Sequence, residues 1–298
     1  MTIQFNCPNC NSIIAFADKH SGKRARCTTC GQLLIIPSKS SEKAKKVKLT
    51  KEKGQPIPGF YHAVFVDNWK LFFNSENATS LVFVIAVICF KFFLGKGICC
   101  TSYISFIVVW GWLLGFYLNI IYETAFDIDK LPEIYLGTFV TFVWYIIKPF
   151  FLFFITMAVV QLPLIITLAM LKDKGFSYQN IWDEHTGSHL LLQGLMLFGL
   201  FLFPIAVLTT AVGRAFSMFR PDYLLGPVFK AFVPYVITVA LLTAAAILET
   251  QTNQYDADAG LALIAGHLML NLAVQVIAII AMRSIGLFRR HYSCHFAW

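Results

Sequence analysis

Residues Leu190–Val212 read LLLQGLMLFGLFLFPIAVLTTAV, an uninterrupted apolar stretch without a charged side chain. A helix of about 20 mainly apolar residues is long enough to cross the roughly 30 Å of hydrocarbon in a bilayer. The whole chain of 298 residues is similarly apolar, because 57% of its residues are hydrophobic and only 13% are charged. Soluble domains carry about 25% charged residues. This composition excludes a soluble globular protein and predicts that most of the chain lies in lipid.

Comparable apolar windows recur along the chain and predict an all-α polytopic membrane helix bundle over residues 59–298. The expected transmembrane helices cover residues 78–95, 98–121, 149–171, 190–212, 231–248 and 261–282. Shorter apolar and aromatic stretches predict interfacial helices near residues 60–73, 134–147 and 221–232. We expect Lys148-Pro149 to separate the second interfacial helix from the span that follows, because proline removes a helical hydrogen bond.

The amino-terminal end carries four cysteines in two C-x2-C pairs, Cys7 with Cys10 and Cys27 with Cys30, with sixteen residues between the pairs. This spacing is typical of a structural Zn²⁺ site with four thiolate ligands. Residues 1–37 contain too few apolar side chains for a core of their own, so one bound zinc ion would supply much of their stability. Redox-active or disulfide-forming pairs are the alternative, but neither pair lies in a βαβ pattern. We therefore expect a small, β-rich zinc ribbon.

The same segment resembles the small zinc ribbons found at the front of many bacterial proteins. The resemblance rests on the two pairs and their flanking residues: Phe5, Cys7-Pro8-x-Cys10, Gly22-Lys23, Cys27-x-x-Cys30-Gly31 and Ile36-Pro37. We expect such a ribbon to contact a protein partner or to be purely structural. Nucleic-acid binding is the less favoured alternative, because the zinc-loaded module would carry only a slight positive charge, whereas nucleic-acid binders show a marked basic stripe.

The membrane half is similar to the uncharacterised multi-pass proteins that bacteria often fuse to such ribbons. Four short stretches carry this similarity: Gly115–Tyr122 leading into Asp127-x-Asp129-x-Leu131-Pro132-Glu133, then Phe203-Pro204, then Arg220-Pro221, and Arg283-Ser284-Ile285-Gly286-Leu287-Phe288 with Arg290-His291-Tyr292. The resemblance implies a permease-like helical bundle, and it implies no particular activity.

Residues 38–58 form a polar, lysine-rich stretch between these two parts and predict a flexible basic linker. Four of its lysines are candidate contacts to anionic lipids: Lys43, Lys45, Lys46 and Lys48. A lysine close to an anionic membrane surface contributes up to about 1 kcal/mol of binding free energy. The equally weighted alternative is a solubilising spacer that also acts as a topology signal.

An even number of spans places both ends of the chain on one side of the membrane. The loops expected on that side hold eight lysines and arginines, whereas the loops on the opposite side hold three. The positive-inside rule therefore predicts an inner (cytoplasmic) membrane protein with cytosolic N- and C-termini. A cytosolic front end also suits zinc-binding thiolates, because the cytosol keeps cysteines reduced.

His267, Asn271 and Gln275 recur every four residues in the last expected span, so they share one helix face at membrane depth. Polar side chains at that depth must face protein or water. One interpretation is the substrate or proton path of a transporter or channel, in which His267 titrates. The favoured alternative is interhelical hydrogen bonding, for which the candidate partners are Thr238, Thr243, Gln161 and Gln193.

Glu123, Asp127, Asp129 and Glu133 form an acidic cluster on an expected inner loop. Several carboxylates together could hold a divalent cation. The favoured explanation is helix capping and ion pairing across the inner face, and the candidate partners are Arg214, Arg220 and Arg289.

The sequence lacks the common motifs of hydrolases and nucleotide-binding enzymes. It contains no H-E-x-x-H, no G-x-S-x-G, no phosphate-binding glycine loop and no dinucleotide fingerprint. His185 and His189 share a helical spacing that a metal or hydrolytic site would need, but Gly187 lies between them, and two interfacial histidines are the favoured explanation. The sequence therefore favours a non-enzymatic membrane protein whose ribbon docks a protein partner or regulates the bundle.

Overall fold

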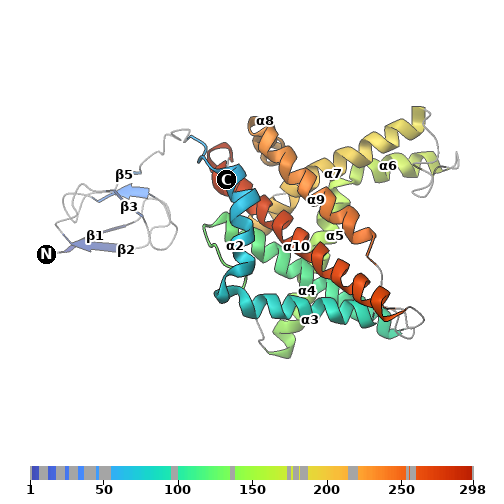
Figure 1. Cartoon of the computed structure of the whole chain (residues 1–298). Helices are drawn as coiled ribbons and strands as arrows, with labels where there is room; N and C mark the ends of the chain where they lie inside the picture. The colour runs from blue at the N-terminus through green and yellow to red at the C-terminus, as the bar shows by residue number, and fades with distance from the viewer. Residues whose placement is uncertain are drawn as a thin grey trace. The chain divides into compact units, whose positions relative to one another are not determined.

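The structure, a computed structural model of the whole chain, consists of a small β unit and a larger helical unit (Figure 1). It describes residues 2–6, 13–17, 24–26, 33–36, 45–46, 55–94, 100–134, 138–172, 176, 181, 187–213, 221–252, 255 and 260–296. The units are Met1–Gly54 and Gln55–Trp298, and each has a hydrophobic core of its own.

The amino-terminal unit contains short antiparallel strands. β1 (Thr2–Asn6) pairs with β2 (Ile13–Ala17), and β4 (Leu33–Ile35) lies between β3 (Arg24–Arg26) and β5 (Lys45–Lys46). Its core consists of the buried side chains of Phe5, Ile14, Leu34 and Ile36. β5 lies within residues 38–58, the segment that the sequence predicts to be a flexible linker. Its residues Lys45 and Lys46 instead form a strand, which pairs with Ile35 and Leu34 of β4.

The helical unit has the following elements in chain order: α1 (Phe60–His62), a π-helical turn (Ala63–Asp67), α2 (Asn68–Phe73), a 3-10 turn (Ser75–Asn77), α3 (Ala78–Leu94), α4 (Cys100–Ala125), α5 (Phe139–Val160), α6 (Leu162–Leu171), α7 (Gly187–Gly213), α8 (Pro221–Lys230), α9 (Phe232–Thr250), α10 (Leu261–His291) and a final 3-10 turn (Ser293–His295). Helices thus occur at each of the six expected spans and at the expected interfacial segments near residues 60–73 and 221–232.

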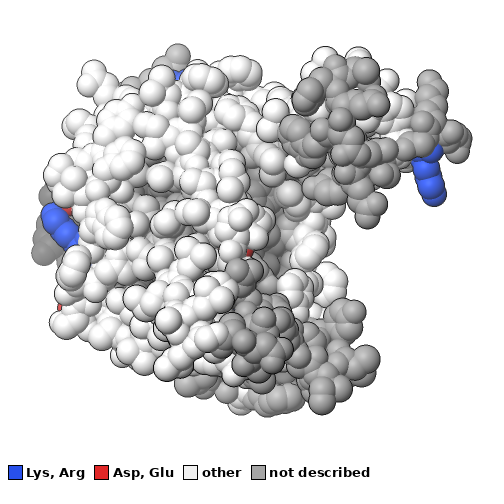
Figure 2. Space-filling view, turned by 45° about the vertical axis from the view of Figure 1, so that its right-hand side comes forward, with Lys and Arg blue, Asp and Glu red and all other residues white. Residues whose placement is uncertain are grey.

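Six helices in the described part of the chain are long and apolar enough to cross a membrane, as the sequence predicts. They cover Ser75–Phe93, Ser105–Ala125, Val140–Val160, Gly187–Gly213, Phe232–Thr250 and Leu261–His291. Large apolar side chains such as Phe151, Leu197 and Val233 lie exposed on their outer faces. Figure 2 shows one face of the molecule on which charged side chains are rare. This surface suits contact with a lipid bilayer.

Two glycines let the central helices approach closely. α10 crosses α4 and also packs against α9, α3 and α7 (Figure 1). A Cβ atom at Gly286 of α10 would lie 2.8 Å from the carbonyl oxygen of Ile121 on α4, and one at Gly111 of α4 would lie 2.6 Å from the carbonyl oxygen of Ile146 on α5. Small residues permit such close backbone approach between membrane helices.

The third span differs from the sequence prediction. α5 runs without interruption through Pro149, so residues 139–147 belong to the span and not to a separate interfacial helix, and the span does not begin at 149. The helix instead ends at Val160, and α6 is a separate apolar helix that starts with Pro163 in its first turn. A Cβ at Gly115 of α4 would lie 3.1 Å from Cγ of Pro149. α4 thus lies close to α5 at the proline, and membrane helices tolerate proline where a neighbouring helix packs against it.

Candidate functional site

One end of the helical unit carries α2, the start of α3, the loop after α4 and the end of α10 (Figure 1). Buried Asn77 joins two of these parts, because its Nδ2 donates to the carbonyl oxygen of Leu71 and its Oδ1 accepts from the backbone N–H of Leu131, both at 2.9 Å. Ser80 Oγ donates to the carbonyl oxygen of Pro132 at 2.8 Å. These bonds fix the loop after α4 against α2 and α3.

Asp127 reverses the chain at the end of α4. Its φ of 67° is left-handed, a conformation that aspartate tolerates better than most residues. The N–H of Ile128 donates to the carbonyl oxygen of Glu123 at 3.0 Å, and the N–H of Asp127 donates to that of Thr124 at 3.3 Å. This pair of bonds is a Schellman motif, which satisfies the last carbonyl groups of a helix. It brings Asp127 and Asp129 to the end of α10.

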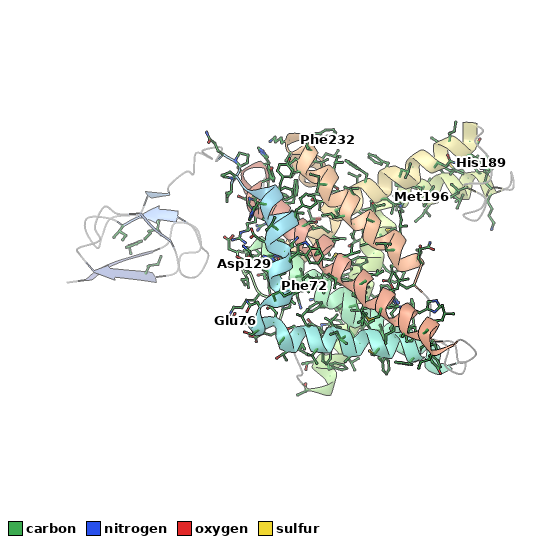
Figure 3. The ribbon with its side chains drawn as sticks, in the orientation of Figure 1. Phe72, Glu76, Asp129, His189, Met196 and Phe232 are labelled. Atoms are coloured by element: carbon green, nitrogen blue, oxygen red, sulfur yellow. The ribbon has the colours of Figure 1, made fainter. Side chains whose placement is uncertain are left out.

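Arginines of α10 pair with these two carboxylates. Arg283 donates through Nη2 to Oδ1 of Asp129 at 2.8 Å, and Arg290 donates through Nη1 to the same oxygen at 2.8 Å. Arg290 also pairs through Nε with Asp127. The side chain of Arg283 is only 6% exposed, whereas that of Asp129 is 55% exposed. Figure 3 shows Asp129 at the same end of the unit as Glu76, and His189 at the opposite end.

The acidic cluster of the sequence analysis is therefore divided. Asp127 and Asp129 form ion pairs, as the favoured explanation requires, but with Arg283 and Arg290. Arg289 instead donates to the carbonyl oxygen of Ala125 at 3.1 Å. Glu123 and Glu133 line a different cavity, where Lys130 pairs with Glu76 at 2.7 Å. Among the described residues, no group of three or more acidic, histidine or cysteine side chains is placed to hold a metal ion.

A cavity of about 640 Å³ lies at this end of the unit between α1, α2 and α10. Its charged lining residues are Asp67, Lys70, Asp127, Asp129, Arg283 and Arg290. Asp67 accepts from Lys70 at 2.7 Å and from Nδ1 of His62 at 3.0 Å, and these two hydrogen bonds lower the pKa of its carboxyl group. The cavity also has an apolar part, formed by residues such as Ile57, Leu71 and Leu287.

The start of the helical unit is attached to its end beside this cavity. The N–H of Ile57 donates to the carbonyl oxygen of His291 at 2.8 Å, and the His291 ring nitrogen Nδ1 lies 2.9 Å from the carbonyl oxygen of Ile57. The ring of Phe60 contacts those of His291 and Tyr292, with centroids 5.9 and 5.6 Å away. Both ends of the helical unit thus lie on one side of it.

The polar stripe of α10 faces protein. Asn271 and Gln275 are each 3% exposed, and His267 is half-buried on the same helix face. Gln275 accepts a hydrogen bond through Oε1 from the hydroxyl of Tyr117 on α4 at 2.6 Å, and Asn271 donates to the carbonyl oxygen of His267 at 2.9 Å. Gln275 therefore makes an interhelical hydrogen bond, but its partner Tyr117 is not among the four candidate residues.

An ion pair at the opposite end of the spans was not predicted. Lys91 of α3 pairs with Glu249 of α9, and the two side chains are 14% and 20% exposed. Lys91 also lies over the ring of Trp110 on α4, with Nζ 5.1 Å from the centroid. A lysine near the end of a span usually extends to the membrane surface instead. The sequence feature that could have indicated this ion pair is Glu249, an acidic residue at the end of an otherwise apolar stretch.

Several predicted site residues lie outside the described residues. These are the four cysteines Cys7, Cys10, Cys27 and Cys30, the lysines Lys43 and Lys48, and also His185, Arg214 and Arg220. Lys45 and Lys46 are described through the backbone of β5. His189 is buried on α7, where its ring lies 4.8 Å from that of Phe176.

In comparisons with known proteins, no family model, no curated protein and no solved structure matches the chain. The class of protein therefore follows from its own architecture. The described part has the six apolar helices of a multi-pass membrane protein, with a separate small unit at the amino-terminal end.

Proposed function

We propose that this chain is a non-enzymatic, multi-pass membrane protein whose amino-terminal zinc ribbon docks a protein partner or regulates the helical bundle. The division of the chain into two compact units with separate cores carries this proposal. A small unit with a core of its own suits recognition, because its surface can bind a partner while the spans of the same chain hold it at the membrane. The hydrogen bond between Tyr117 and Gln275 also favours a packed bundle.

The zinc ion belongs to this proposal, with the thiolates of Cys7, Cys10, Cys27 and Cys30 as its ligands. The position of the cysteines in the sequence supports it. The first pair falls between β1 and β2 and the second between β3 and β4, and in both cases the flanking strands are antiparallel partners. Zinc ribbons place C-x2-C pairs on such connections, and the bound ion would have a structural role only. Four buried hydrophobic side chains are a small core for an independent unit.

The zinc assignment is tested on the purified full-length protein by elemental analysis. We expect one zinc ion per chain, and we expect it to be lost when Cys7 and Cys27 are both replaced by serine. Cys89→Ser with Cys294→Ser is the matched control, because these two thiols lie in the helical unit. Absence of stoichiometric zinc from the wild type, or equal zinc in the two double variants, would contradict the assignment.

The docking role is tested by affinity capture from membranes, with three forms of the chain: wild type, a deletion of residues 1–37 and the Cys7→Ser/Cys27→Ser variant. We expect the same set of partners to be lost from the deletion and from the cysteine variant, while the Cys89→Ser/Cys294→Ser control retains it. Partners that are unchanged without residues 1–37 would exclude the docking role.

We also propose that the chain lies in the cytoplasmic membrane with both termini in the cytosol. The short hydrogen bonds between Ile57 and His291 support a common side for the two ends of the helical unit. The excess of lysine and arginine on that side supports the cytosolic orientation. Reporters fused after Trp298 and before Met1 should both be active in the cytosol. A reporter after Trp298 that is active on the opposite side would reject this orientation.

The second candidate is a transporter or channel. The polar stripe of α10 favours it, because the half-buried His267 and the buried Asn271 lie on one face of a span, and polar residues at membrane depth often mark an ion or proton path. Proteoliposomes loaded with a pH-sensitive dye, under a potassium diffusion potential, measure proton flux. The transport interpretation expects a flux that falls in His267→Ala and Asn271→Leu. A flux indistinguishable from that of empty liposomes, or one that both substitutions leave unchanged, would reject it.

A further inference from the structure

The cavity beside α2 contains a buried cationic group with an unused donor. Arg283 lines this cavity, and its Nη2 is bound to Asp129. Its other terminal nitrogen, Nη1, is buried and has no hydrogen-bond partner among the described residues. A buried donor without an acceptor is unfavourable, and the effect is greatest for a charged group. A further acceptor would therefore stabilise this guanidinium group, and an oxygen of a ligand in the cavity becomes that acceptor when a rotation of the side chain turns Nη1 toward it.

The charges around the cavity are balanced in number and mixed in sign. Three cations, Lys70, Arg283 and Arg290, face three carboxylates, Asp67, Asp127 and Asp129. These groups already form ion pairs with one another, so a purely anionic ligand would also approach the carboxylates, and a purely cationic ligand would also approach the arginines. A zwitterion that places an anionic group near Arg283 and a cationic group near Asp127 is complementary to both. Asp127 is suited to the second role because its side chain is 71% exposed.

The helix that borders the cavity has an apolar outer face. Phe60, Val64 and Leu71 are buried toward the bundle, whereas Tyr61, Phe65, Trp69 and Phe73 are exposed and follow one another at helical spacing. A helix with tryptophan and phenylalanine on its outer face lies in the headgroup region of a bilayer. The cavity would then open at the depth where lipid phosphates lie, and acyl chains could follow the aromatic face.

We infer that this cavity binds the headgroup of an aminophospholipid, with the phosphate at Arg283 and Lys70 and the primary ammonium group at Asp127. Arginine suits phosphate because its planar fork matches the geometry of two oxygens. A primary ammonium donates hydrogen bonds to a carboxylate, which the quaternary ammonium of choline lacks the N–H groups to do. The volume of about 640 Å³ lies within the range of roughly 300–1,000 Å³ for small-molecule pockets. The inference requires a membrane-embedded bundle and is independent of the zinc ribbon.

The test is native mass spectrometry of the full-length protein in detergent, titrated separately with phosphatidylethanolamine, phosphatidylcholine and phosphatidylglycerol. We expect one tightly bound ethanolamine lipid, with an affinity roughly tenfold above that for the other two lipids, the effect of one or two charge-assisted hydrogen bonds. Equal affinities for the three lipids would overturn the inference. Displacement by soluble phosphoethanolamine at the same concentrations as the lipid would assign the site to a free phosphate ester instead.

Three variants locate the site. Arg283→Lys retains a positive charge near Asp129 but removes the guanidinium fork, Lys70→Gln removes an exposed cation, and Asp127→Asn removes the proposed ammonium partner. We expect the first two to weaken the ethanolamine lipid about tenfold and the third to abolish its advantage over phosphatidylglycerol. Lys130→Gln is the control, because Lys130 forms an ion pair at the same end but lines another cavity. If Arg283→Lys does not fold, the other two variants decide. Unchanged selectivity in Lys70→Gln and Asp127→Asn would overturn the inference.

Discussion

The hydroxyl of Tyr117 on α4 donates a hydrogen bond to Oε1 of Gln275 on α10, with the two oxygens 2.6 Å apart between spans. Both residues are buried, at 4% and 3% exposure. Neither side chain can reach bulk water, so each depends on the other for its hydrogen bond. Such a bond links the two central helices of the bundle and fixes their relative rotation.

This bond predicts an energetic coupling between the two residues. We expect Tyr117→Phe and Gln275→Leu each to lower the free energy of unfolding by about 1 kcal/mol, because a polar group is left without its partner or a hydrogen bond is lost. The double variant should be destabilised by less than the sum, since it removes both partners. Unfolding curves in mixed detergent measure all three. Strict additivity would mean that the bond contributes nothing.

The Lys91–Glu249 pair predicts a compensating double substitution. Glu249→Leu alone leaves the ammonium group of Lys91 largely buried without its partner, so we expect a loss of about 2 kcal/mol, below the 3–5 kcal/mol typical of fully buried pairs. Lys91→Met in the same chain should restore much of that loss, because two apolar side chains suit a membrane span. Thermal unfolding in detergent tests this. A double variant less stable than Glu249→Leu would contradict it.

The close approach of α10 to α4 predicts opposite results at two glycines of α10. A Cβ at Gly286 would lie 2.7 Å from Cβ of Thr124, so Gly286→Ala should destabilise the bundle by about 1–3 kcal/mol. Gly266 has no neighbouring atom within 4 Å of the added Cβ. Gly266→Ala should leave stability unchanged or raise it by up to about 1 kcal/mol, because alanine favours the helix. Chemical unfolding of both variants measures the difference, and equal effects would refute the packing argument.

The loop after α4 predicts unequal roles for its two aspartates. Asp129 accepts from Arg283 and Arg290 through one oxygen, whereas Asp127 pairs with Arg290. Asp129→Asn should therefore destabilise the end of α10 by about 1–2 kcal/mol, because the largely buried Arg283 loses its counter-charge. Asp127→Asn should cost less than about 1 kcal/mol, as expected for an exposed pair. Hydrogen exchange of the last turns of α10 reports both effects. A larger effect of Asp127→Asn would reverse the assignment.

The number of spans and their approximate positions could be predicted because a bilayer demands a long apolar helix and leaves few alternatives. The predicted ends of a span differ from the observed ones where the helix contains a proline. Pro149 suggested the end of a helix, and yet α5 continues through it while α4 packs alongside at Gly115. That contact joins residues far apart in the chain, so no local rule could reveal it.

The candidate sites divide in the same way. The polar stripe on α10 follows from helical periodicity, and its burial was expected of polar groups at membrane depth. The hydrogen-bond and ion-pair partners of these residues could not be predicted from the sequence. Gln275 bonds to Tyr117 on α4 and not to Thr238, Thr243, Gln161 or Gln193, and Arg283 rather than a loop arginine pairs with Asp129. Which side chains become partners depends on which faces of two helices contact each other, and on how far the helices are shifted along their axes.

Composition, charge distribution and cysteine spacing are properties of short windows, and they were enough to assign a bundle of apolar helices with a distinct amino-terminal module. Contacts between helices are different, because many pairings of apolar faces bury similar areas and have similar energies. Close backbone approach at Gly111 and Gly286 and the hydrogen bonds between spans select one arrangement among them. The cavity between α2 and α10 exists only in that arrangement, since its lining residues come from three separate segments of the chain, within residues 57–74, 127–129 and 283–291.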